Sequence, residues 1–119
     1  MYDKKGNIIY EAYTNDEKEG NGKYINEDGT YYIGQFKNYL PNGKGIEYYK
    51  NRSIRYEGDF IDGKYEGNGK FINEDGIYYI GQFKNGLKNG KGKLCLKNGI
   101  IFYRGTFIND KVTLNCVIN

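Results

Sequence analysis

The sequence predicts an all-β fold, an elongated single-layer antiparallel β-hairpin solenoid of about five hairpins, and three observations support it. First, a block at residues 19–38 returns almost unchanged at residues 66–85. Second, aromatic residues and glycines alternate with polar residues, as along a half-buried strand. Third, 17% of the residues are aromatic and 18 are glycine, although only 38% are hydrophobic. Such close repetition indicates stacked units instead of one catalytic pocket.

A shorter unit of 23 or 24 residues lies inside the repeated block. Its marker is Tyr-x-Gly-x-Phe followed by Gly-x-Gly, and its tyrosines stand at positions 32, 56, 79 and 103. These steps divide a single repeat array over residues 1–119 into units at 9–31, 32–55, 56–78, 79–102 and 103–119. The first and last units are degenerate, as terminal copies of a repeat array commonly are.

Each unit is predicted to be one β-hairpin. In the unit at 56–78, the alternation predicts a strand near 56–60 and a second strand near 67–72. We expect the six residues 61–66 to join these strands. The Asn-Glu-Asp-Gly segment at 73–76 is favourable turn chemistry, because Asn, Asp and Gly tolerate positive φ, and it would lead into the next unit. Five units then give roughly ten strands in one meander.

The glycines and aromatic residues are predicted to share one face, which would form a groove for a peptide or helix of a protein partner. The aromatic residues of this groove are Tyr32, Phe36, Tyr56, Phe60, Phe71, Tyr79, Phe83, Tyr103 and Phe107. Glycine normally weakens a strand, so we expect a ring from a neighbouring strand to lie over each bare glycine backbone. The glycines of the groove floor are Gly34, Gly45, Gly58, Gly69, Gly81 and Gly92.

The residue types argue against an enzyme. The chain has no histidine, which removes the commonest general base and the commonest zinc ligand. Paired acids at 27–28 and 74–75 fall in repeated turns, where solvated turn residues are the favoured interpretation. The acids between positions 16 and 19 lack the spacing of a calcium loop. We therefore expect no catalytic residues, no metal site and no cofactor.

The repeated Tyr-x-Gly-x-Phe marker with its following Gly-x-Gly resembles the MORN repeat (membrane occupation and recognition nexus), over about residues 9 to 118. The resemblance implies a non-catalytic scaffold or adaptor for protein–protein interaction at a membrane or a cytoskeletal structure. Several proteins of this kind form homodimers, and here the open terminal strand suits such pairing. MORN arrays also occur as accessory segments of enzymes, so a targeting segment of a larger enzyme assembly is a further alternative.

Basic residues gather in the C-terminal half and predict another function, binding to anionic phospholipid. The net charge is only +3, yet no acidic residue occurs between positions 76 and 109. The basic residues of this stretch are Lys84, Lys88, Lys91, Lys93, Lys97 and Arg104. Strand alternation predicts that Lys88 lies in a hairpin loop, whereas Lys84, Lys91, Lys93 and Arg104 face away from the aromatic residues.

Each basic residue near an anionic bilayer contributes about 1 kcal/mol, so this set could hold a salt-sensitive contact. The competing interpretation is a solvated outer face that keeps the sheet edges soluble. Nucleic acid is a less favoured partner, because the aromatic residues are committed to the groove and the sequence pI is only about 8.7.

The C-terminal residues Cys116-Val-Ile-Asn have the C-a-a-X form of a prenylation signal. Asparagine is not a usual final residue of that signal, so a last strand with Leu114, Cys116 and Ile118 on its inner face is the favoured interpretation.

No stretch has the length of a signal-peptide core or of a transmembrane span. We expect a cytoplasmic protein that is not secreted, with peripheral attachment to a membrane or the cytoskeleton as an alternative.

Overall fold

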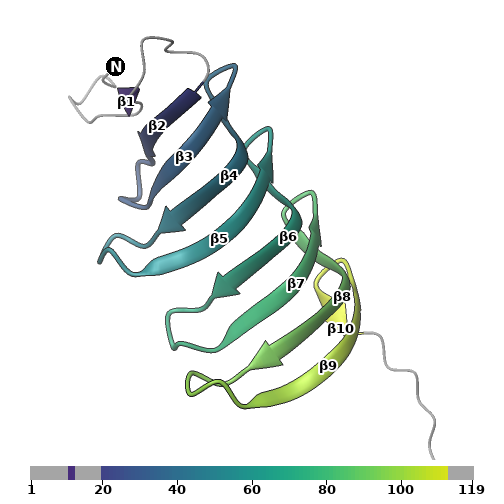
Figure 1. Cartoon of the computed structure of the whole chain (residues 1–119). Helices are drawn as coiled ribbons and strands as arrows, with labels where there is room; N and C mark the ends of the chain where they lie inside the picture. The colour runs from purple at the N-terminus through teal and green to yellow at the C-terminus, as the bar shows by residue number, and fades with distance from the viewer. Residues whose placement is uncertain (1–10, 13–19, 113–119) are drawn as a thin grey trace, which may run out of the picture.

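The computed structural model describes residues 11–12 and 20–112, and it confirms the predicted fold class. Ten antiparallel strands form one sheet, and each strand lies beside its neighbour in sequence (Figure 1). The described residues contain no helix. Because the sheet is a meander without crossovers, it passes uninterrupted from one repeat to the next.

The strands are short at the two ends of the sheet and longer between them. They are β1 (Glu11–Ala12), β2 (Gly20–Ile25), β3 (Tyr31–Lys37), β4 (Leu40–Tyr48), β5 (Ile54–Ile61), β6 (Lys64–Ile72), β7 (Tyr78–Lys84), β8 (Leu87–Cys95), β9 (Ile101–Ile108) and β10 (Lys111–Val112). Two kinds of turn alternate between them, so one kind lies at each end of the strands.

The turns at one end, which we call the hairpin end, contain only two residues. The prediction of a six-residue connection at 61–66 is wrong, because β5 ends at Ile61 and β6 begins at Lys64. The two connecting residues, Asp62 and Gly63, both have positive φ, 50° and 82°, as a type I′ turn requires. Positive φ at both positions recurs in the turns at 38–39, 85–86 and 109–110.

The turns at the opposite end, the repeat-joining end, are the ones that the Asn-Glu-Asp-Gly segments predict. The N–H of Asn73 donates to the carbonyl of Ile77 over 2.9 Å, and the N–H of Gly76 donates to the carbonyl of Asn73 over 2.9 Å. The Asp75 carboxylate accepts the N–H of Ile77 over 2.9 Å. The same backbone pattern closes the turns at 26–29, 49–52 and 96–99, so the prediction of these turns is confirmed.

A row of paired glycines crosses the sheet from β2 to β9. It consists of Gly22, Gly34, Gly45, Gly58, Gly69, Gly81, Gly92 and Gly105. The Tyr56 ring covers Gly69, where an added Cβ would lie 2.5 Å from the ring atoms Cε2 and Cζ. The corresponding pairs are Tyr32 over Gly45 and Tyr79 over Gly92. The prediction that rings cover bare glycine backbone is therefore confirmed in three repeats.

The tyrosine rings also stabilise a bulge beside the glycine row. In β5 the register shifts between Gly58 and Phe60, which leaves Asp59 without a partner residue on β6. The Tyr56 hydroxyl donates to the carbonyl of Asp59 over 2.8 Å, and the Asp59 carboxylate accepts the N–H of Asn68 over 3.0 Å. The same two hydrogen bonds recur at Gln35 and Gln82, so these three repeats satisfy their bulges in the same way.

The core of the sheet is a column of perpendicular aromatic rings along the face that carries these tyrosines, the inner face. Tyr56 contacts Phe60 on its own strand, with ring centroids 4.9 Å apart, and Phe83 of the next repeat at 5.2 Å. The pattern repeats from Phe36 to Tyr103. Because Tyr32, Tyr56 and Tyr79 each contact a phenylalanine of the next repeat, no single hairpin has a complete core.

Candidate interaction surfaces

The aromatic residues predicted to line a partner-binding groove fill the inner face of the sheet. The buried ones, with 5% exposure or less, are Tyr32, Phe36, Tyr56, Phe60, Tyr79, Phe83 and Phe107. Phe71 and Tyr103 are partly buried against this cluster. Little ring surface is left for a partner in this conformation, so partner binding by these rings stays a prediction.

The glycines predicted to form the groove floor lie beneath these rings. An added Cβ at Gly58 would lie 2.5 Å from the carbonyl oxygen of Asn68 and 2.9 Å from the Tyr56 hydroxyl. Backbone of the neighbouring strand is equally close at Gly34 and Gly81. These glycines therefore act through close packing, and their side of the sheet is covered.

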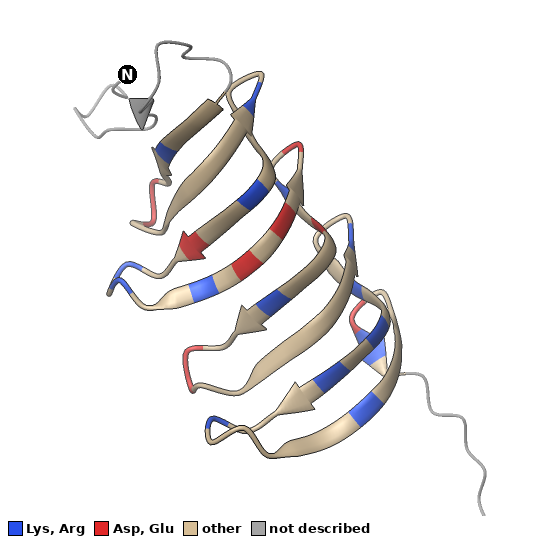
Figure 2. Ribbon diagram, in the orientation of Figure 1, with Lys and Arg blue, Asp and Glu red and all other residues tan. Residues whose placement is uncertain are grey.

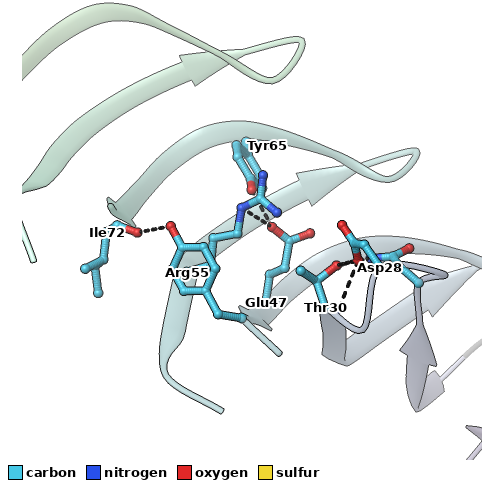
Figure 3. Close-up of polar contacts among 8 residues, drawn as sticks. Asp28, Thr30, Glu47, Arg55, Tyr65 and Ile72 are labelled. Carbon is cyan, nitrogen blue, oxygen red and sulfur yellow. Dashed lines mark hydrogen bonds and ion pairs between the residues drawn. The ribbon is translucent and has the colours of Figure 1, made fainter. Parts of the chain in front are cut away.

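A polar cluster interrupts the inner face near the middle of the array (Figure 3). Glu47 on β4 pairs with Tyr32 and Tyr56 on the two flanking strands. The Tyr65 hydroxyl donates to the Glu47 carboxylate, and the Arg55 Nε lies 3.5 Å from the same carboxylate. Apolar Leu94 holds the corresponding position between Tyr79 and Tyr103, so this ion pair is a departure from the repeat pattern.

The surroundings of the cluster keep Tyr65 protonated and hold the side chains of Arg55 and Tyr49 in place. Burial, and then the negative charge of Glu47, raise the pKa of Tyr65 well above its ordinary range, so its hydroxyl remains a donor. The Arg55 guanidinium lies over the rings of Tyr49 and Phe71, 5.6 and 5.8 Å from their centroids. The Tyr49 hydroxyl donates to the carbonyl of Ile72 over 2.6 Å, which ties this ring to the next repeat.

A cavity of about 530 Å³ opens beside Arg55 at the repeat-joining end. It is lined by Asp28, Thr30, Tyr49, Lys50, Asn51, Arg55, Phe71, Asn73 and Glu74. The lining combines two aromatic faces with both signs of charge. The Thr30 hydroxyl and N–H donate to the Asp28 carboxylate over 2.6 and 2.9 Å, and these hydrogen bonds lower the pKa of Asp28. This cavity can therefore offer charged and hydrogen-bonding groups to a ligand.

The six basic residues predicted to contact anionic lipid do not form one surface (Figure 2). Lys84 ends β7 at the hairpin end, whereas Lys97 packs against the turn at Gly76 at the repeat-joining end. The prediction that Lys88 lies in a loop is wrong, because the hairpin loop is shorter than expected and Lys88 belongs to β8. Its Nζ lies 5.7 Å from the centroid of Tyr79 on the inner face.

The remaining three, Lys91, Lys93 and Arg104, gather on the opposite, outer face. Lys93 pairs directly with Arg104, and Lys91 pairs with Thr106. They line a depression of about 380 Å³ together with Ile80. Like charges directly opposite each other on adjacent strands destabilise a sheet. Stability therefore does not explain why Lys93 lies opposite Arg104.

The first half of the array neutralises the same positions. Lys44 on β4 forms an ion pair with Asp59 on β5, and Ile46 pairs with Glu57. The hydrogen bond from Lys44 is the main reason why the pKa of Asp59 is lowered. Two repeats later the carboxylates are replaced by Arg104 and Thr106, so the outer face changes from balanced to basic along the array.

The repeated arrangement of covered glycines and bridging tyrosines agrees with the comparison to known families. A model of the MORN repeat matches residues 12–31, 32–54, 56–78 and 79–100. The chain belongs to the MORN repeat family. A search of curated proteins found no match. MORN repeats often mediate interactions with membranes or proteins, and the repeat itself is generally a non-catalytic module.

Other predictions for this MORN array have different outcomes. Cys116, the candidate for prenylation, and the last strand predicted to carry it with Leu114 and Ile118 lie outside the described residues. Homodimer pairing through a terminal strand stays a prediction. Within residues 11–12 and 20–112, no three His, Cys, Asp or Glu side chains gather as metal ligands. The part of the chain that the structure describes also has no helix long and apolar enough to cross a bilayer.

The buried tyrosines of the MORN array are expected to make its stability sensitive to alkaline pH. Burial raises the pKa of Tyr32, Tyr56 and Tyr65 above the ordinary value of 10.0. Since the unfolded chain ionises near that ordinary value, this stability is fully present below about pH 10 and is lost as the pH rises further. Tyrosinate absorbance followed with circular dichroism should show these rings ionising only as the sheet unfolds. Ionisation of all 14 tyrosines near pH 10 with the sheet intact would contradict their burial.

Proposed function

We propose that this MORN array is a non-catalytic adaptor that binds a protein segment on its inner face, at the cavity beside Arg55. The observation that supports this proposal is the polar cluster of Glu47, Arg55 and Tyr65. A partly buried ion pair adds little to stability, and well-packed apolar residues often replace one without loss. Two repeats later Leu94 and Phe102 hold the positions of Glu47 and Arg55, so the two charges at this position suit recognition of a partner.

The chemistry of the cavity indicates the kind of segment that it would bind. The guanidinium of Arg55 is flanked by Tyr49 and Phe71, and its Nε already lies near Glu47. A carboxylate or carbonyl of the partner could accept hydrogen bonds from the guanidinium, and an apolar side chain could pack on the two rings. The partner segment is therefore expected to combine an acidic residue with an apolar one.

A displayed peptide library selected on the purified chain tests this proposal. We expect Arg55→Ala to weaken the selected peptides at least tenfold, about 1.4 kcal/mol, because the guanidinium is the main donor in the cavity. Arg52→Ala is the matched control, since Arg52 is an exposed turn residue outside the cavity lining. Equal binding to wild type and Arg55→Ala would show that the inner-face site is wrong.

A second candidate function is binding to anionic phospholipid through Lys91, Lys93 and Arg104. It is favoured by the direct pairing of Lys93 with Arg104, because the first half of the array has Ile46 opposite Glu57 at the same positions. An anionic headgroup would relieve the repulsion between these like charges. Salt should weaken such a contact, because exposed charges are screened at physiological ionic strength.

Flotation with vesicles of phosphatidylserine and phosphatidylcholine tests the second candidate. We expect binding at low salt, and a loss of at least tenfold when Lys91, Lys93 and Arg104 are all changed to glutamine. A control with the same loss of charge changes Lys50, Arg52 and Lys97, which are exposed at the repeat-joining end. If both triple variants lose binding equally, the interaction reflects net charge and the assignment to the outer face fails.

A further inference from the structure

We propose that a row of lysines and aliphatic residues at the hairpin end is the line along which the chain contacts an anionic bilayer. This hairpin row consists of Lys37, Leu40, Ile61, Lys64, Lys84, Leu87, Ile108 and Lys111. The inference rests on the lipid-binding function proposed above, and it adds an apolar component and an orientation. It draws on residues that neither the basic outer face nor the inner cavity includes.

Each two-residue turn is closed by one lysine directly opposite one aliphatic residue. The closing pairs are Lys37 with Leu40, Ile61 with Lys64, Lys84 with Leu87, and Ile108 with Lys111. The aliphatic side chains are left exposed by 37–55%, and the lysines are also exposed. These pairs follow Phe36, Phe60, Phe83 and Phe107 by one residue, so strand alternation points them away from the aromatic core.

The order of the residues produces aliphatic pairs separated by lysines. The lysine comes first in the closing pairs at turns 38–39 and 85–86 and second at turns 62–63 and 109–110. Leu40 on β4 and Ile61 on β5 therefore lie on neighbouring strands, as do Leu87 on β8 and Ile108 on β9. Between these two aliphatic pairs lie Lys64 and Lys84. A bilayer surface offers both acyl chains and anionic headgroups, so it is complementary to this alternation.

Hydrogen bonds between consecutive turns hold the hairpin row in line. The N–H of Gly63 donates to the carbonyl of Pro41 over 2.9 Å, and that of Gly86 donates to the carbonyl of Tyr65 over 3.0 Å. The N–H of Asp110 donates to the carbonyl of Lys88 over 2.9 Å. Because adjacent strands are about 4.8 Å apart, four such turns present their side chains along roughly 30 Å. A flat surface can meet all of them at once.

Two nearby carboxylates are engaged with backbone groups. The Glu66 carboxylate accepts the N–H of Asn85 over 2.9 Å, and the Asp110 carboxylate accepts the N–H of Lys88 over 2.7 Å. Asp62 is a further acid within the turns of the row. Four exposed lysines therefore outnumber the acids of these turns, which gives the hairpin row the charge that complements anionic lipid.

A tryptophan reporter tests the contact, because the chain contains no tryptophan of its own. Leu87→Trp places the reporter in the hairpin row, and Phe102→Trp, at a side chain 51% exposed near the repeat-joining end, is the matched control. With phosphatidylserine vesicles that carry brominated acyl chains, we expect a blue shift and at least twofold quenching for Leu87→Trp. The control should show neither change.

A second variant removes the aliphatic groups without changing charge. Changing Leu87 and Ile108 to serine should weaken binding to the same vesicles at least tenfold, while circular dichroism should show the sheet intact.

Binding to anionic vesicles with an unquenched Leu87→Trp, or with quenching of the control, would overturn the hairpin row but leave lipid binding in place. No binding to anionic vesicles at low salt would overturn both. Unchanged binding of the serine variant would also contradict the proposal. Contact of a partner protein with the hairpin row, in place of the bilayer, would contradict it as well.

Discussion

Replacing Tyr56 with alanine is expected to destabilise the chain by about 4 kcal/mol, the middle of the range for buried aromatic residues. Tyr56 has no exposed surface. Its ring contacts Phe60 and Phe83 edge-on and stacks on Tyr65 with centroids 3.9 Å apart. The substitution would also remove the hydroxyl that donates to the carbonyl of Asp59. Urea denaturation followed by circular dichroism measures the loss.

The matched control for this substitution is Phe102→Ala. Phe102 is also an aromatic residue on a strand that has a neighbour on each side, but 51% of it is exposed. We therefore expect a cost within about 0.5 kcal/mol, as for most surface substitutions. Equal effects of the two substitutions would show that the aromatic column does not carry the stability assigned to it.

Replacing Gly69 with alanine is expected to cost about 3 kcal/mol, because overpacking forces buried groups to move. The added Cβ would lie 2.3 Å from the Tyr56 hydroxyl oxygen and 2.5 Å from two ring carbons. The ring has little freedom to yield, since Phe60, Phe83 and Tyr65 surround it. Thermal and urea unfolding would both register this cost.

Gly86→Ala separates this steric effect from the general cost of replacing glycine. No atom lies within 4 Å of a Cβ added at Gly86, but its φ is +84°. Backbone strain in that region costs an alanine about 1 kcal/mol. A cost for Gly69→Ala no larger than that of Gly86→Ala would mean that the ring does not need the bare backbone.

The alternation of Tyr56, Gly58 and Phe60 was sufficient to predict one face of the sheet and its meander. It did not predict the bulge at Asp59, because a register shift depends on the neighbouring strand. The first strand was therefore predicted to end near Phe60 and the second to begin near Gly67, which left residues 61–66 as a long loop, although Asp62-Gly63 is the strongest kind of short hairpin signal. The error about Lys88 has the same origin.

The candidate sites depended still more on register. Nothing in the spacing of Glu47, Arg55 and Tyr65 places them together, since they belong to three strands and Arg55 lies at a register shift. A charged residue in a slot that is apolar in another repeat, Glu47 against Leu94, was the available signal. The opposition of Lys93 and Arg104 likewise required the pairing of β8 with β9.

A double-mutant cycle between Tyr56 and Gly69 tests most directly whether rings seated on bare glycines hold this array together. Tyr56→Leu removes the ring atoms that Gly69→Ala would strike, so the alanine should cost about 3 kcal/mol in the wild-type chain and less than about 1 kcal/mol in the leucine variant. The two free energies come from urea denaturation of four purified chains. An equal cost of Gly69→Ala in both backgrounds would contradict the account.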